Sequence, residues 1–178
     1  YELRKNGSDN SICIGQGSGG NLATTGGEGN VNIGFFTGYS IANGASNNFN
    51  MGYSAGYSNQ TGAANLNIGP YSGYYNVSSS SNINLGNQAG YNGTGANNVN
   101  IGSTAGRQGT SVTGCVNIGF SAGYNNASSN RLHIENSDGT TPLIGGDFST
   151  NQVGINITNG SIGNTLHVGG GVRINSLD

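Results

Sequence analysis

The chain has 178 residues, of which 35 are Gly and 30 are Asn, whereas only five are Lys or Arg and seven are Asp or Glu. The formal net charge of −2 argues against nucleic-acid binding, which needs clustered basic side chains to displace counterions. No apolar run approaches the ~20 residues that cross a bilayer, so we expect no membrane insertion. No signal peptide is visible, and the start at Tyr1 suggests a fragment or a processed chain.

A repeat occupies residues 11–126, after a lead-in at residues 1–10. Its first glycines lie 16 to 19 residues apart, and each follows an apolar-x-apolar triplet such as residues 31–33. A fixed short period predicts stacked units instead of a globule with one pocket. We therefore predict an all-β fold, with a parallel β-solenoid (β-roll) of about seven coils. The repeated glycine pairs are Gly15 and Gly19, Gly34 and Gly38, Gly52 and Gly56, Gly69 and Gly73, Gly86 and Gly90, Gly102 and Gly106, and Gly119 and Gly123.

Residues 30–39 illustrate how one coil is expected to fold. Alternation places Val31 and Ile33 on one face of a strand and Asn32 on the other. Gly34 then bends the chain, and the Thr37-Gly38-Tyr39 segment forms a second short strand, with turn formers completing the coil. We expect the sparse apolar side chains to be buried between coils, because stacking lets each unit cover its neighbours.

Stacking also aligns one Asn from each coil. Side chains of this kind can hydrogen-bond along a stack, so we predict a buttressing Asn ladder. The alternative is a flat polar array that binds a regular surface such as ice, although such surfaces more often present Thr rows. The predicted ladder consists of Asn32, Asn50, Asn67, Asn84, Asn100 and Asn117, with Cys13 at the same position in the first repeat.

A Tyr column is predicted beside the second glycines. It allows two interpretations: packing against a neighbouring coil or chain, which we favour, or stacking on carbohydrate. Arg107 takes the Tyr position in the sixth repeat and is expected to disturb the column locally. The column consists of Tyr39, Tyr57, Tyr74, Tyr91 and Tyr124.

The two cysteines, Cys13 and Cys115, are six coils apart in this arrangement. At ~4.8 Å per strand they lie roughly 29 Å apart along the stack. A disulfide tolerates a Cα separation of only ~7 Å, so the solenoid forbids an intrachain bridge. Two buried or half-buried thiols are the expected state, and the alternative, a bridge between equivalent cysteines of two subunits, requires a position near a symmetry axis.

The period ends after residue 130, and residues 127–178 are predicted to form a β-rich stalk. Its strands are expected at residues 131–135, 142–148, 152–156 and 165–174. His133 and His167 each stand between apolar residues of such a strand. We interpret both as ordinary strand residues, the alternative being a metal ion held by His copies on a trimer axis.

Catalytic and cofactor motifs are weak. Gly15, Gly17 and Gly20 make a formal GxGxxG, but the residues that follow are not a helix, so dinucleotide binding is rejected. The seven acidic residues form no close carboxylate pair, although partners in glycoside hydrolysis can be distant in sequence. We predict no enzyme activity, cofactor or resident metal.

The repeats resemble the head coils of trimeric autotransporter adhesins, and more closely the Asn-rich, Ile-Gly and Ala-Gly-Tyr repeats of phage tail-fibre-like proteins. The resemblance covers residues 11 to about 126. Residues 127–178 resemble the stalk that precedes an endosialidase-type intramolecular chaperone, which in that family drives trimerisation and then cleaves itself off. The resemblance implies a homotrimer, and the small core of one coil favours oligomerisation independently.

The predicted function is that of a structural shaft in a trimeric viral or phage fibre involved in host attachment. A bacterial surface adhesin head is the alternative, and a polysaccharide-depolymerising tailspike is a third. The expected partners are two further copies of the chain, the adjoining fibre segments, and a cell-surface receptor or glycan. The expected location is a virion fibre or an extracellular surface.

Overall fold

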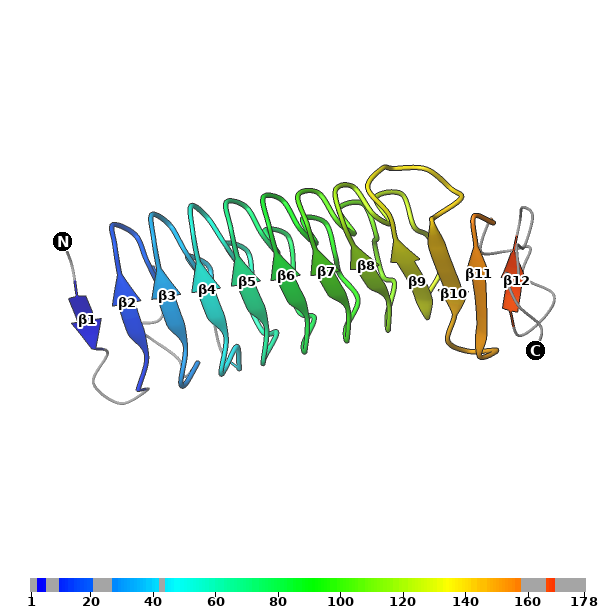
Figure 1. The fold of residues 1–178 in the computed structure, drawn as a ribbon. Helices are drawn as coiled ribbons and strands as arrows, with labels where there is room; N and C mark the ends of the chain where they lie inside the picture. The colour runs from blue at the N-terminus through cyan, green and yellow to red at the C-terminus, as the bar shows by residue number, and fades with distance from the viewer. Residues whose placement is uncertain (1–2, 6–9, 21–26, 42–43, 158–165, 169–178) are drawn as a thin grey trace, which may run out of the picture.

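The computed structural model describes residues 3–5, 10–20, 27–41, 44–157 and 166–168. Twelve strands lie side by side in one sheet, in chain order (Figure 1). These residues contain no helix, and so no helix that is long and apolar enough to cross a membrane. The strands are β1 (Leu3–Lys5), β2 (Ile12–Ile14), β3 (Val31–Ile33), β4 (Phe49–Met51), β5 (Leu66–Ile68), β6 (Ile83–Leu85), β7 (Val99–Ile101), β8 (Val116–Ile118), β9 (Arg131–Ile134), β10 (Ile144–Asp147), β11 (Gln152–Ile155) and β12 (Leu166–Val168).

Strands β2 to β9 are parallel, and each lies one coil further along the rod than the last. Equivalent repeat positions pair directly: in β5 and β6, Asn67 is opposite Asn84. This confirms the all-β, parallel β-solenoid predicted from the period. At the start of the chain, β1 is antiparallel to β2 and covers the edge of the first coil.

The strands beyond residue 126 continue the same sheet. β9 pairs in register with β8, whereas β10 is antiparallel to both β9 and β11. β9 and β11 lie where strands were predicted, and β10 is shorter than the predicted 142–148. β12 pairs with β11 in parallel, and residues 169–174 of the last predicted strand lie outside the described residues.

Each coil contains one three-residue strand, so the prediction of two strands per coil is wrong. The segment around Thr37-Gly38-Tyr39 is a turn, although the Gly38 N–H still donates to the Ala55 carbonyl of the next coil at 2.9 Å. A left-handed residue stands in each such segment, for example Phe36 with φ 51° and Tyr71 with φ 56°. An extended strand has φ near −120°, so this residue ends it.

The predicted burial of the strand side chains is inverted. Asn30, Asn32 and Asn50 are fully buried, whereas the apolar side chains at alternate positions point outward and are half-buried or exposed. The interior opposite the strand is narrow, because it is lined by small residues such as Ala55 and by the second glycine of each pair. A compact planar amide from the strand fits this space, and the buried branched side chain of Ile41 comes from the segment between β3 and β4.

The interior amides are paired from coil to coil. From Asn50 onward, each Nδ2 of the predicted ladder donates to the Oδ1 of the preceding coil at 2.7–2.8 Å, as Asn67 does to Asn50. At the first coil, Asn32 Nδ2 donates to Cys13 Sγ at 3.6 Å. A second ladder lies two residues earlier in each coil, where both the backbone N–H and Nδ2 of Asn65 donate to Asn48 Oδ1 at 3.0 Å. Paired in this way, a polar interior avoids the cost of burying unsatisfied amides. The second ladder consists of Asn30, Asn48, Asn65, Asn82 and Asn98.

The two glycines of each pair have different roles. Gly69 has φ +123°, and a Cβ there would lie 2.6 Å from the Gly86 carbonyl oxygen, so the first glycine lets adjacent coils approach. Gly56 faces the interior, where a Cβ would lie 2.8 Å from the amide carbon of Asn50. The second glycine therefore makes room for the ladder.

Candidate functional site

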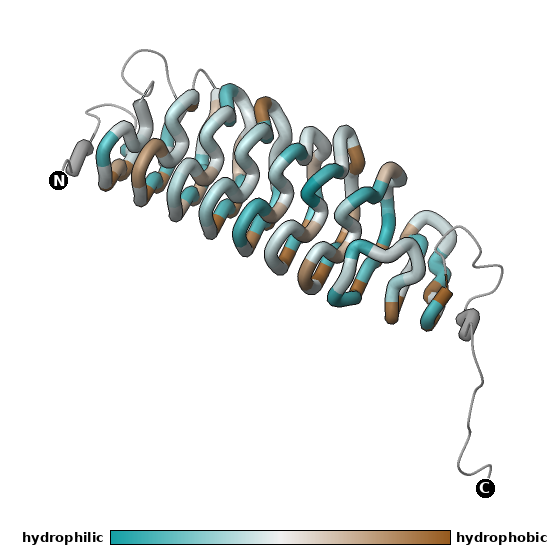
Figure 2. Tube along the Cα trace, turned by 90° about the horizontal axis from the view of Figure 1, so that it is seen from above, coloured by the Kyte–Doolittle hydropathy of each residue, from teal (hydrophilic) through white to brown (hydrophobic). Residues whose placement is uncertain are grey.

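The outer face of the sheet carries two columns of apolar side chains. In β6, Ile83 is 39% and Leu85 is 41% exposed. Figure 2 shows apolar residues recurring at the same place in successive coils. We call these columns the apolar sheet face: Ile12, Val31, Phe49, Leu66, Ile83, Val99 and Val116 in one, and Ile14, Ile33, Met51, Ile68, Leu85, Ile101 and Ile118 in the other.

This face is uncharged over most of its length, because the sequence has no Asp, Glu, Lys or Arg between Glu28 and Arg107. Beside it, large aromatic side chains at Phe35, Tyr53 and Phe120 are 38%, 46% and 54% exposed. The rings of Phe35 and Tyr53 stack with centroids 5.4 Å apart. A long, flat apolar surface of this kind is typical of a protein–protein interface.

A second candidate surface is the Tyr column. The rings of Tyr39, Tyr57, Tyr74 and Tyr91 stack coil on coil, with centroids 5.0–5.3 Å apart and planes within 13° of parallel. Burial raises the pKa of Tyr74, and the neighbouring Tyr57 adds to the rise. The ring faces are therefore occupied by one another, which supports packing and leaves no middle ring face for a sugar.

Arg107 continues the column, so the predicted disturbance is wrong. Its guanidinium lies over the rings of Tyr91 and Tyr124, at 5.0 and 5.5 Å from their centroids. Nη1 donates to the Tyr124 hydroxyl at 2.7 Å, and Nε donates to Gln88 Oε1 at 2.9 Å. A planar cation replaces a ring here, with cation–π contacts on both sides.

The Asn ladder ends at His133. Its Nδ1 lies 2.9 Å from Asn117 Oδ1, where the next Asn amide would donate. Burial, helped by the charge of Arg131, lowers the His133 pKa to about 4. The ring is therefore neutral near pH 7, with Nδ1 donating to the ladder.

Glu135 occupies the glycine position of the same coil and is 8% exposed. Burial raises the pKa of its carboxyl, while the Ser137 hydroxyl, which donates to Oε2 at 2.9 Å, opposes the rise. Oε1 has no hydrogen-bond partner among the described residues. His133 and Glu135 thus place two buried titratable groups where the repeats end.

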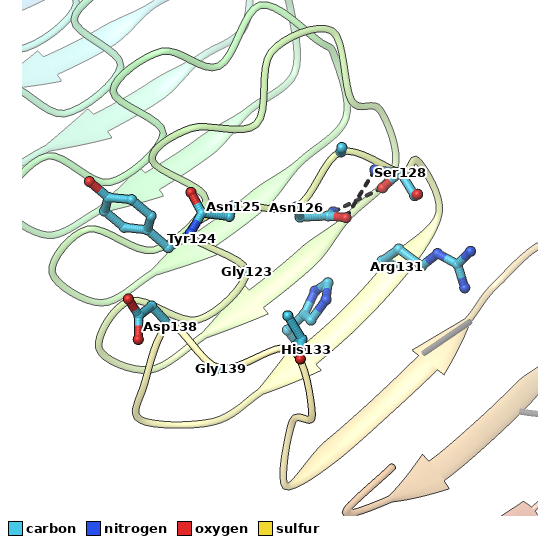
Figure 3. Close-up of a pocket in the computed structure, with 11 residues that line it drawn as sticks. Gly123, Tyr124, Asn125, Asn126, Ser128, Arg131, His133, Asp138 and Gly139 are labelled. Atoms are coloured by element: carbon cyan, nitrogen blue, oxygen red, sulfur yellow. Dashed lines mark hydrogen bonds between the residues drawn. The ribbon is translucent and has the colours of Figure 1, made fainter. Parts of the chain in front are cut away.

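A cavity of about 220 Å³ opens beside these residues (Figure 3). Glu135 N–H still donates to Ile118 O at 3.0 Å, as Gly119 N–H does to Ile101 O one coil earlier, and the Phe120 N–H donates to the Asn136 side chain at 3.2 Å. Beyond that point, no backbone hydrogen bond among the described residues joins 123–128 to 138–140. The two segments separate, and they line the cavity with Arg131 and His133.

The alternative of a polar array that binds ice is excluded, because all six ladder Asn side chains are at most 5% exposed. Cys13 and Cys115 are both buried and form no disulfide with each other. His167 lies in β12, opposite Gly154, where only the backbone is described. Within the described ranges, no three His, Cys, Asp or Glu side chains gather where they could hold a metal ion.

Comparison with known proteins gives no match: no family model, no curated protein and no solved structure resembles the chain. The second Asn ladder was missed by sequence reasoning, although its signal was present in every Asn-x-Asn pair. The cavity left no comparable signal, since its residues come from segments on both sides of residue 130.

Proposed function

We propose that the chain is a shaft segment of a homotrimeric viral or phage fibre that serves host attachment. The observation that carries the proposal is the apolar sheet face, with two outward apolar side chains on each strand from β2 to β8. An exposed apolar surface of this length is costly in water, and a second copy in the same register covers it with identical residues.

The interior of the rod supports the same function. The ladders and glycine columns pair each coil with the next, so the rod is stiff and can be extended by adding coils. Three parallel copies joined through their apolar sheet faces would form a thicker shaft without exposing those faces. The number three comes from the resemblance of the repeats to trimeric fibre and adhesin coils.

A trimeric adhesin head on a bacterial surface has the same physical basis and remains the alternative. In either setting the segment lies outside the cell or on a virion, and its neighbours are the adjoining parts of the same fibre. The two settings differ in what the segment is joined to. A viral fibre is joined to a virion-attachment domain, and a bacterial adhesin is joined to a membrane anchor.

The test is the solution mass of the chain, measured by light scattering at several concentrations under reducing conditions. We expect a mass of about three chains of 17.9 kDa each. The Leu85→Glu variant places a charge on the apolar sheet face and is expected to be monomeric. Gln60→Glu, an exposed substitution outside the strands, is the matched control and should keep the trimer. The proposal is overturned if the unmodified chain is a monomer. It is also overturned if the Leu85→Glu variant has the same mass in solution as the unmodified trimer.

A further inference from the structure

The Tyr column differs between its middle and its C-terminal end. Tyr91 is covered on both sides, by Tyr74 at 5.3 Å and by Arg107 at 5.0 Å. Tyr124 has Arg107 over its ring at 5.5 Å, and no other described ring lies against it. The same residue lines the cavity at the end of the repeats (Figure 3). Among the described residues of the column, Tyr124 thus combines a ring face that no other ring covers with an opening to the cavity.

Polar side chains line the same cavity as this ring. Asn125 and Asp138 come from the two segments that separate to form the cavity, and both are exposed. An amide offers donors and an acceptor, and a carboxylate accepts two hydrogen bonds side by side. Adjacent hydroxyls on a sugar ring match such groups, while the C–H face of the sugar packs on an aromatic ring.

The charge of the cavity favours an uncharged ligand. The Arg131 guanidinium is paired with Asp147 at 2.8 Å, and His133 is neutral near pH 7. Among the described residues of the lining, Asp138 carries a charge that no ion pair neutralises, and its carboxylate repels phosphate and carboxylate groups that approach it. A nucleotide or an acidic sugar is disfavoured on this ground.

The size of the cavity indicates how much of a ligand it holds. At about 220 Å³, and open to solvent, it has room for one pyranose ring, and further units of a glycan would lie outside it.

We propose that this cavity binds one uncharged monosaccharide unit of a glycan, with its ring on Tyr124 and its hydroxyls on Asp138 and Asn125. The biological purpose of such binding rests on the proposed attachment function. The site itself lies within one chain and does not need the trimer.

The experiment is saturation-transfer NMR on the full 178-residue chain. The probes are methyl glycosides of glucose, galactose, mannose and N-acetylglucosamine, with N-acetylneuraminic acid as the anionic probe. We expect at least one neutral glycoside to bind and to receive saturation at its ring C–H protons. Tyr124→Ala and Asp138→Asn should each weaken that binding at least tenfold.

Two further variants separate ligand contact from disturbance of the fold. Tyr124→Phe keeps the ring and loses only the hydroxyl that accepts from Arg107, so it should retain binding. Tyr75→Ala removes an exposed ring outside the cavity and should bind as the unmodified chain does. No neutral binder, binding unchanged by Tyr124→Ala and Asp138→Asn, or preference for the anionic sugar overturns the inference.

The mass of the same sample keeps the two proposals distinguishable. A monomer that binds a neutral glycoside overturns the fibre proposal and supports the cavity. A trimer that binds none of the four neutral glycosides overturns the cavity and supports the fibre.

Discussion

The middle coils and the end of the stack solve the same packing problem differently. Between β3 and β7 the interior is filled mainly by Asn, small residues and Gly, with Ile41 as a buried apolar side chain, and each ladder amide is bonded to the coils on both sides. At β9 the equivalent positions hold His133 and Glu135, both buried. The middle coils contain no charge at all, whereas the end contains the titratable groups and the cavity.

The comparison shows what repetition provides. A narrow polar interior is stable when every buried amide meets an identical partner one coil away. Where the repeat stops, the last coil has no identical neighbour, so other side chains must complete the pairing. The side chains that take this place, His133 and Glu135, can change protonation state, and a cavity lies beside them. The end of the rod is therefore the part that we expect to respond to pH and to ligands.

The largest expected effect comes from breaking the middle of the ladder with Asn67→Leu. This change leaves Asn50 Oδ1 without its donor and Asn84 Nδ2 without its acceptor. Each unsatisfied buried group costs about 1–3 kcal/mol, so we expect a loss of roughly 2–6 kcal/mol in the free energy of unfolding. Chemical denaturation at matched protein concentration measures it.

The control is Asn87→Ala, since Asn87 is exposed and lies outside both ladders. It should change stability by less than ~0.5 kcal/mol. Equal losses in Asn67→Leu and Asn87→Ala would show that the ladder contributes nothing specific.

Much of the fold could be predicted from the sequence, because like positions repeat in register. The glycine pairs gave the coil, and the Asn-x-Asn pattern gave the alternation in each strand. Alternation alone does not tell which face is inside, and the usual preference for apolar burial gave the wrong answer for Val31 and Ile33. The narrow interior beside Gly38 and Thr37 decides which face is buried. Its width depends on how the coil closes, and the alternation within one strand does not contain that information.

The candidate site was less predictable for a related reason. The uncovered ring of Tyr124 depends on how the 136–143 segment departs from the coil path, which no period encodes. Arg107 was predicted to disturb the Tyr column because it replaces the Tyr of the sixth repeat. Its planar guanidinium, lying between two rings, has the shape that the column needs.

A pH experiment probes the difference between the ends and the middle of the ladder. The unfolded chain, with a His pKa of about 6.5, takes up a proton at pH values where folded His133, with a pKa of about 4, does not. Stability should therefore fall as the pH decreases from about 6.5 to about 4 and level off below. By linkage the loss is roughly 3 kcal/mol.

Denaturation as a function of pH measures this loss, and His133→Asn is the informative variant. It continues the ladder with an amide that does not titrate, so the loss between pH 6.5 and 4 should disappear. Both measurements are best made in chains that also carry Glu135→Gln. The pKa of Glu135 is raised by burial, so its contribution makes stability fall as the pH rises and opposes the effect of His133. A loss that persists in the His133→Asn variant would assign it to other groups.

The smallest expected effect concerns Arg107, where the middle of the Tyr column meets its end. Arg107→Ala removes two ring contacts and the bonds to Gln88 and Tyr124, and we expect a loss of about 1–2 kcal/mol. Arg107→Tyr restores the residue found at this position in the neighbouring coils and should stay within ~0.5 kcal/mol of the unmodified chain. Thermal unfolding of the two variants measures the difference. If Arg107→Tyr is as destabilised as Arg107→Ala, the guanidinium hydrogen bonds, and not the stacking, hold the end of the column in place.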